Sequence, residues 1–514
     1  MTNFDVEAAW AYHNGTKHSH ESIYADPHHL DWENQPLPFK IYTTVEPLPL
    51  PRDLLSSSVP ALAALSTVNV PPDVSAVPSL PLLATLLYFS AGITKSRRYP
   101  GGEILFRAAA CTGALYHIEL YLVCSDLPDL EAGVYHFAPA DFALRRLRQG
   151  DYRGLLAQAT GGEPSVATAP LTLICTGTYW RNAWKYRART YRHCFWDTGT
   201  ILANLLAVSA AHALPTKIVL AFVDTLVNQL LGLDVEREVA LTLVTVGHDP
   251  QAQPGPPPPV DPLVLETMPL SNTEVDYPAI RAMHAASSLS QEAEAAAWRG
   301  RTPPHSWPAP AGELFPLQPL GAADLPSGTL EQVIRRRGSS RRFARVPIGI
   351  AQLSTILQRA TQGIPTDFLD PPGAMLNDLY LIVNAVDDLP NGAYVFRRDR
   401  EALELLRRGA FRREAGYLGL MQDIPADASV DVLFLTDLRA IFGRFGNRGY
   451  RAAQLEAGII GGKLYLSAYA QRLGASGLTF FDDDVTHFFA PHAADKSVMF
   501  LVALGKAGKL RSDA

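Results

Sequence analysis

The sequence DLEAGVYHF at residues 129–137 recurs as DLPNGAYVF at residues 388–396, and this repeat decides how the chain is built. The offset between the copies is 388 − 129 = 259 residues, and the same offset carries Gly199 onto Gly458. An offset that stays constant over such a span indicates duplication, and its period is too long for a solenoid of small repeats. We therefore predict two copies of one whole domain.

A proline-rich stretch separates the two copies. Residues 249–262 read DPQAQPGPPPPVDP, and such a segment forms an extended, semi-rigid spacer rather than a packed element. We therefore predict a first domain at residues 1–248, a linker at 249–262 and a second domain at 263–514.

Each copy is predicted to combine helices and strands, in the α+β class. Short apolar runs that end at turn residues are typical of buried strands. Two longer stretches, 199–213 and 456–470, carry apolar and small residues at helical spacing and are predicted to be central buried helices. The predicted strands are 120–124, 171–176 and 240–246 in the first copy and 379–383, 430–436 and 498–504 in the second.

The composition is that of a globular protein with a sizeable core, with 47% hydrophobic and 19% charged residues. A net charge of −6 gives no reason to expect nucleic acid or an anionic membrane as a partner. The longest apolar stretch, 199–214, is interrupted by His212 and is shorter than the roughly 20 residues that a membrane-spanning helix needs. We expect a soluble protein of the cytoplasm.

Neither a disulfide framework nor a metal site is predicted. Five of the histidines lie within the first 29 residues, but their spacing matches no H-x-x-x-H or H-E-x-x-H pattern. Four cysteines without a C-x-x-C pair favour reduced thiols. All four lie in the first half, at Cys111, Cys124, Cys175 and Cys194.

The most pointed segment is RRRGSSRRF at residues 335–343, which holds five arginines in nine positions. Guanidinium groups and serine hydroxyls at this density form a natural phosphate clamp through charge-assisted hydrogen bonds. The alternative is a solvated basic helix end that interacts with the helix dipole. The segment alone does not separate these two interpretations.

Three motifs add a family resemblance. The pattern R-x-S-x-R-x-F at 337–343 resembles the FMN-phosphate motif of nitroreductases. The stretch RAAACTGALYHIE at 107–119 resembles the R-x-x-P-S-x-G-x-L-Y-P-x-E motif of SagB-type dehydrogenases, and KYRARTYR at 185–192 resembles their Lys-Tyr motif followed by R-x-Y-R. Together with the lead segment YHNGTKH at 12–18, these motifs extend the resemblance to this flavin family over nearly the whole chain. Its members oxidise thiazolines and oxazolines in peptide natural products.

The resemblance implies an intramolecular pseudo-dimer of two nitroreductase-like domains with flavin at their interface. One copy would hold the FMN phosphate, and the other would supply a loop beside the flavin and a reactive Lys-Tyr pair. The implied catalytic residues are Lys185 and Tyr186. The implied cofactor-binding residues are Arg337, Gly338, Ser339, Arg341, Lys506 and Arg511 from the second copy and Cys111, Thr112 and Gly113 from the first.

The two copies differ in the residues that such a site needs. Residues 53–94 of the first copy contain no Lys or Arg, although its clamp would lie there. At the repeat offset, the loop and the Lys-Tyr pair become DPP at 370–372 and RF at 444–445 in the second copy. An FMN phosphate without cations would be left unpaired at a substantial cost. We therefore expect one FMN per chain, between the halves, and an empty second site.

The implied reaction is hydride transfer to the flavin with proton removal by Lys185 or Tyr186. The pKa of a free lysine or tyrosine side chain is near 10, so it would have to be lowered for either residue to act as a base. Ala110 and Cys111 replace the family's proline and serine, and His117 replaces another proline, which leaves the substrate open. We expect a peptide, carrier-bound or other small-molecule substrate with azoline-type C–N bonds, and biosynthetic partner enzymes. The alternatives are an NAD(P)H-dependent nitro or enone reductase and a non-catalytic flavin-binding partner.

Overall fold

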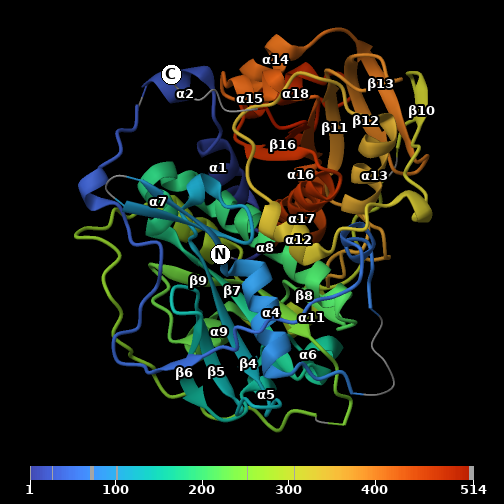
Figure 1. Ribbon diagram of the computed structural model, residues 1–514. Helices are drawn as coiled ribbons and strands as arrows, with labels where there is room; N and C mark the ends of the chain where they lie inside the picture. Colours follow the sequence, from blue (N-terminus) through green and yellow to red (C-terminus); the bar gives the residue numbers. More distant parts are fainter. Residues whose placement is uncertain are drawn as a thin grey trace.

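Two sheets of the same design form the body of the protein. The computed structural model describes residues 2–25, 27–69, 75–99, 102–251, 253–305 and 307–508. Each half contains a seven-stranded antiparallel sheet, and in Figure 1 the first lies in the lower part and the second at the upper right. In spatial order, the first sheet is β1 (Pro47–Pro49), β6 (Ala143–Gln149), β5 (Gly133–Ala138), β4 (Ile118–Cys124), β7 (Leu171–Thr178), β9 (Glu238–Val246) and β8 (Thr216–Val219).

The second sheet repeats this order strand for strand. It runs β10 (Leu314–Pro316), β13 (Ala402–Arg408), β12 (Gly392–Arg397), β11 (Asp378–Val383), β14 (Val430–Thr436), β16 (Ser497–Gly505) and β15 (Gly474–Leu478). The predicted α+β class and the tandem repeat are therefore confirmed. All six predicted strands lie within β4, β7, β9, β11, β14 and β16.

Helices cover the sheets and fill the space between them. The first half contains α1 (Glu7–Gly15), α2 (His20–Ala25), α3 (Ala61–Ala64), α4 (Leu80–Ala91), α5 (Arg153–Ala159), α6 (Pro164–Thr168), α7 (Tyr179–Tyr186), α8 (Thr190–Ala211) and α9 (Asp224–Leu231). The second contains α10 (Pro278–Ala286), α11 (Glu292–Trp298), α12 (Leu330–Arg336), α13 (Ile350–Ala360), α14 (Arg412–Leu418), α15 (Asp423–Asp427), α16 (Leu438–Phe445), α17 (Arg448–Ala470) and α18 (Asp482–Phe488).

The two long central helices, α8 and α17, pack against each other at the centre of the molecule (Figure 1). They cross at the glycines that the repeat offset pairs: a Cβ on Gly199 would lie 2.5 Å from the carbonyl carbon of Gly458. Only residues without a side chain allow the backbones to come so close. Both helices begin several residues earlier than the stretches predicted from 199 and 456.

Each half also reaches across to the other. In α1, the backbone N–H of Ala9 donates to Asn447 Oδ1 at 3.1 Å, so the N-terminal helix lies on the second half. Conversely, Thr267 pairs with Tyr42 of the first half in an isolated bridge, beyond the predicted linker. The described residues of 249–262 form no helix or strand. Because each half places a segment on the other, the division of the chain at residues 249–262 does not correspond to a flat interface between two bodies.

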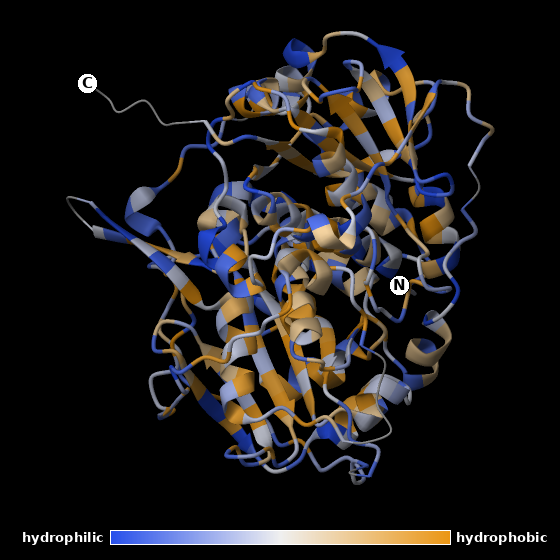
Figure 2. Cartoon of the chain, turned by 45° about the vertical axis from the view of Figure 1, so that its right-hand side comes forward, coloured by the Kyte–Doolittle hydropathy of each residue, from blue (hydrophilic) through white to orange (hydrophobic). Residues whose placement is uncertain are grey.

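The apolar residues gather along the strands of both sheets and on the central helices (Figure 2). One helical stretch, Tyr179–Ala211, passes a length and composition test for a membrane-spanning helix with a mean hydropathy of 1.2. However, 89% of its apolar window is buried inside the protein. The packing of α8 against α17 and the first sheet therefore accounts for its apolar character.

Candidate active site

The clamp segment of the second half is tied to the loop of the first half by hydrogen bonds in both directions. Arg337, directly after α12, donates from Nε to the carbonyl of Ala108 at 2.9 Å and from Nη2 to that of Arg107 at 3.0 Å. Lys95 of the first half donates in return to the carbonyls of Arg336 (3.0 Å) and Arg337 (2.6 Å). The two sequence motifs are thus brought together across the interface.

The remaining clamp residues lie at the surface of this junction. Ser339 is 3.2 Å from the hydroxyl of Tyr465, and the Arg341 side chain is exposed. The chain at Lys506 runs beside the clamp, because the N–H of Ala344 donates to the Lys506 carbonyl at 2.9 Å. A Cβ on Gly338 would meet one atom within 4 Å, the Tyr469 hydroxyl oxygen at 3.6 Å. Arg511 lies outside the described residues.

Lys185 and Tyr186 end α7 and face the same junction. The Lys185 ammonium lies 5.5 Å from the ring centre of Tyr186, whose ring packs edge-on against His193 at 4.6 Å. Gly113 has φ +62°, and a Cβ there would lie 2.9 Å from the Tyr186 hydroxyl oxygen. Glycine at this position therefore permits both the loop conformation and the close approach of Tyr186.

The electrostatics of the pair separate the two candidate bases. Partial burial lowers the pKa of Lys185, and the charge of Arg341 from the second half lowers it further. Burial raises the pKa of Tyr186, and Asp197 and Cys111 add to that effect. The lowered pKa makes Lys185 the better base at neutral pH, whereas Tyr186 stays protonated and can donate a hydrogen bond.

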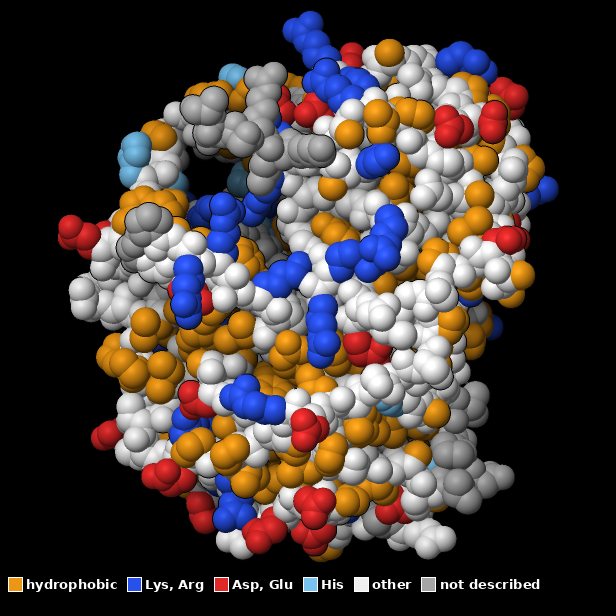
Figure 3. Space-filling view, viewed as in Figure 1, with side chains coloured by type: hydrophobic (Ala, Val, Ile, Leu, Met, Phe, Trp, Pro, Cys, Tyr) orange, Lys and Arg blue, Asp and Glu red, His pale blue; other side chains and the backbone are white. Residues whose placement is uncertain are grey.

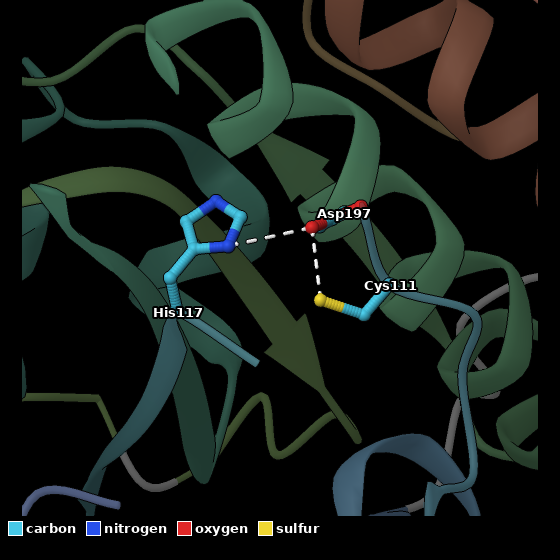
Figure 4. A group of neighbouring side chains, drawn as sticks. All are labelled: Cys111, His117 and Asp197. Carbon is cyan, nitrogen blue, oxygen red and sulfur yellow. Dashed lines mark hydrogen bonds and ion pairs between the residues drawn. The ribbon is translucent and has the colours of Figure 1, made fainter. Parts of the chain in front are cut away.

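Behind the loop, Cys111, His117 and Asp197 meet (Figure 4). Asp197, on α8, accepts from the Cys111 thiol at 3.0 Å and from the N–H and hydroxyl of Thr112, both at 2.9 Å; His117 Nδ1 lies 3.4 Å away. Burial raises the pKa of Asp197 to about 7 and lowers that of His117 to about 3. This carboxylate fixes the loop that carries Cys111, Thr112 and Gly113.

The three side chains also offer ligand atoms within 4.8 Å of one another, a set that a metal ion could use. Each ligand atom has a hydrogen-bonding or ionic neighbour in the protein, as described above. Burial and the neighbouring Asp197 hold the pKa of the Cys111 thiol well above its usual range, so the thiol stays protonated beside the carboxylate. The hydrogen bonds of Asp197 to Cys111 and Thr112 give the cluster the role of a loop anchor.

Asp197 is the residue that sequence reasoning missed, and the repeat could have revealed it. The offset of 259 carries it to Glu456, whose carboxylate accepts from the backbone N–H groups of Leu376 (3.0 Å) and Asn377 (2.9 Å). Burial raises the pKa of Glu456 to about 7 as well. A buried carboxylate on the central helix therefore anchors the corresponding loop in both halves, while Cys111 and His117 belong to the first half alone.

In the second half, the Lys-Tyr position holds a half-buried Arg444 and a buried Phe445, and both contact the segment from Trp298 to Arg301. Arg444 donates to the carbonyls of Arg299 (2.8 Å) and Arg301 (3.1 Å). Phe445 packs against the ring of Trp298 at 4.9 Å, and its carbonyl accepts from the Trp298 indole at 2.8 Å. The segment from Trp298 to Arg301 thus covers the place that corresponds to Lys185 and Tyr186.

Two buried ion clusters join the halves in a reciprocal way. Arg189 and Arg192 of the first half donate to Asp482 of the second at 2.9 and 2.6 Å. Arg448 and Arg451, which the repeat offset pairs with those arginines, each donate to Asp224 of the first half at 2.7 Å. The R-x-Y-R segments therefore hold the two halves together, and one of them begins three residues after Tyr186.

The N-terminal lead segment closes the first of these clusters. Tyr12 donates to the carbonyl of Ala188 at 2.6 Å, Arg192 donates to the carbonyl of His13 at 2.6 Å, and the His18 N–H donates to Asp482 at 2.8 Å. Figure 3 shows Lys and Arg side chains gathered around a hollow between this part of the first half and the second half. The junction is thus positively charged in a chain whose net charge is −6.

Comparison with known proteins agrees with this architecture, although no protein-family model matches the chain. Over 166 residues the chain is 27% identical to a "putative nitroreductase" of Methanocaldococcus jannaschii, covering 32% of this chain and 79% of that protein. Over 153 residues it is 28% identical to the microcin B17-processing protein McbC of Escherichia coli, covering 29% of this chain and about half (52%) of McbC. A crystal structure of a "putative nitroreductase" from Anabaena variabilis matches with a TM-score of 0.77 and 25% identity, over 98% of this chain and 99% of that one.

Proposed function

We propose that this chain, whose two nitroreductase-like domains place it in the nitroreductase superfamily, is an FMN-dependent oxidoreductase with one flavin site between its halves. The observation that carries the proposal is the junction of Arg337 and Arg341 with the loop at 107–113 and with Lys185 and Tyr186. Cations from one half and reactive side chains from the other meet there, as a composite flavin site requires.

The residues of the junction fit the chemistry of FMN. Arg341, the Ser339 hydroxyl and Lys506 would hold the phosphate, which carries roughly two negative charges. The loop that contains Thr112 and Gly113 would lie beside the flavin ring. The corresponding place in the second half is covered by Trp298 and its neighbours, and residues 53–94 offer no cation, which supports one FMN per chain.

When bound, the flavin would supply the hydride acceptor, and the protein supplies position and proton transfer. Lys185 would remove the proton from the atom adjacent to the oxidised carbon, since its pKa is lowered. Tyr186 would donate a hydrogen bond to the substrate, since its pKa is raised and its hydroxyl stays protonated. Asp197 would keep the loop and Tyr186 in register through Thr112.

The Lys-Tyr pair and the similarity to a microcin-processing protein support the substrate class that we propose. We favour dehydrogenation of azoline-type or related C–N bonds in a peptide or natural-product intermediate, within a set of biosynthetic partner enzymes. A second candidate is an NAD(P)H-dependent reductase of nitro or enone compounds, favoured by the similarity to two proteins described as nitroreductases. A flavin-binding partner without catalysis is the third.

The first experiment is to measure flavin per chain in the purified protein. One FMN per chain is expected, and two per chain or refusal of added FMN would contradict the proposal. Lys185→Met combined with Tyr186→Phe should then abolish turnover of an azoline peptide while FMN stays bound. Bleaching of the flavin by NAD(P)H, without bleaching by the azoline peptide, would favour the reductase instead.

A further inference from the structure

Among the described residues, the first half has a hairpin beside the candidate site that the second half lacks. Strands β2 (Ile93–Tyr99) and β3 (Gly102–Arg107) lie between α4 and β4 and form a separate two-stranded sheet. The corresponding connection in the second half, residues 361–377, is shorter and contains no strand. In Figure 2 the hairpin projects from the body of the molecule as an arm. The extra segment therefore belongs to the half that keeps the Lys-Tyr pair.

The base of this arm is fastened to the phosphate clamp. Lys95 in β2 donates to the carbonyls of Arg336 and Arg337, and Arg337 donates to the carbonyl of Arg107 at the end of β3. Both strands are thus held at their base by the second half. Any molecule bound along the arm would be led to the junction that holds Lys185.

The pleat of the hairpin sorts its side chains onto two faces. Residues that alternate with Lys95 share its face, which places Arg97 and Tyr99 on the side turned toward the clamp. Their cross-strand neighbours on that face include Ile104, which pairs with Arg97. Arg98 lies on the opposite face, where its Nε is 3.6 Å from Glu103 Oε1. The clamp-side face is thus basic and apolar.

This face is open to solvent. Arg97 is exposed, Tyr99 is 50% exposed and Ile104 is 42% exposed. Among the described residues, neither strand pairs with any strand besides its partner. Each therefore keeps an unpaired edge toward its tip, whereas at the base the N–H and carbonyl of Arg107 bond to Tyr116 and Arg337. A two-stranded ribbon is marginal in water unless something packs on it.

We propose that strands β2 and β3 of this arm bind an extended acidic segment of the peptide substrate and guide it to the site. A free strand edge accepts a peptide backbone, and alternating side chains of that peptide reach one face. The exposed Arg97 attracts negative charge, and the exposed Tyr99 and Ile104 receive apolar side chains. The inference rests on the proposed function, because it names the class of substrate for the same site.

The test measures binding of a short fluorescein-labelled peptide of alternating glutamate and valine by anisotropy, with a lysine–valine peptide as the comparison. Arg97→Glu should weaken binding of the glutamate peptide by about tenfold or more, since it reverses a charge on the binding face. Arg98→Glu is the matched control on the opposite face and should change binding less than about threefold. Binding should also weaken as salt concentration rises.

Equal losses for Arg97→Glu and Arg98→Glu would overturn the inference, because they would indicate unspecific attraction to a basic arm. Tighter binding of the lysine–valine peptide, or binding of anionic lipid vesicles without the glutamate peptide, would also overturn it. Bound FMN should be the same in both variants as in the natural protein. A colourless protein that binds the glutamate peptide through Arg97 would refute the flavin function and leave the docking face standing.

Discussion

Replacing Asp482 by Asn tests whether the buried ion clusters join the halves and support the flavin site. Asp482 is 2% exposed and accepts from Arg189, Arg192 and the backbone N–H of His18 at 2.6–2.9 Å. The amide would leave two buried guanidinium groups without an anion. Removing one partner of such a pair costs about 3–5 kcal/mol. The midpoint of urea unfolding should fall accordingly.

The repeat provides the matched control, Asp224→Asn. Asp224 is also 2% exposed and accepts from two arginines, so its replacement should cost a similar free energy of unfolding. The consequence for flavin should differ. Arg189 and Arg192 lie three and six residues after Tyr186 in the chain. Asp482→Asn should therefore weaken FMN binding at least about tenfold, whereas Asp224→Asn should leave it within about threefold.

The pH dependence has a definite sign. Burial alone would raise the pKa of Asp224, but Arg448 and Arg451 outweigh it and lower the pKa to about 2. A lowered pKa contributes stability that is present above the ordinary value of about 4 and is lost as the pH falls through 2. The difference in free energy of unfolding between the natural protein and Asp224→Asn should therefore shrink as the pH falls toward 2. A cost below about 1 kcal/mol for Asp482→Asn, or equal loss of FMN in both variants, would refute the reasoning.

Three further predictions concern the helix crossing, the loop anchor and the base. Gly199→Ala places a Cβ 2.5 Å from the facing backbone and should destabilise by at least about 1–3 kcal/mol, whereas Gly443→Ala, with open space around it, should not; equal melting temperatures would contradict this. Because the pKa of Asp197 is raised to about 7, the stability that this group contributes to the folded state is present below about pH 4 and is lost as the pH rises through 7. Asp197→Asn should remove this pH dependence of the free energy of unfolding, which amounts to up to about 4 kcal/mol. Lys185→Met should abolish the rise of kcat/KM with pH, whereas Tyr186→Phe should lower the rate and keep that rise; an unchanged profile in Lys185→Met would exclude it as the base.

The sequence predicted the architecture well because the repeat records it twice. The strands at 120–124 and 379–383 are apolar runs at equivalent positions, and both proved to be central strands of their sheets. The central helices were predicted too short, because their first turns carry arginines such as Arg192 and Arg451. These arginines are buried against Asp482 and Asp224 of the opposite half, a contact that no local pattern reveals.

The sequence indicated the residue types of the candidate site but not the contacts between them. The basic segment at 335–343 indicated a clamp, but not that Arg337 donates to the carbonyls of Arg107 and Ala108. Asp197 was overlooked because a single acid in an apolar helix has no motif around it. Its role depends on the fold, which places it behind a loop more than eighty positions earlier in the chain.

The proline-rich linker has a consequence for how the protein survives dilution. Two separate subunits come apart as their concentration falls, and the stability of an obligate dimer falls with it. A tether between the partners keeps each at an effective concentration of about millimolar near the other, whatever the amount of protein in solution. The melting temperature should therefore stay constant across a wide dilution series. Joining two copies also lets each accumulate its own substitutions, so one pocket could lose its cations while the other kept them.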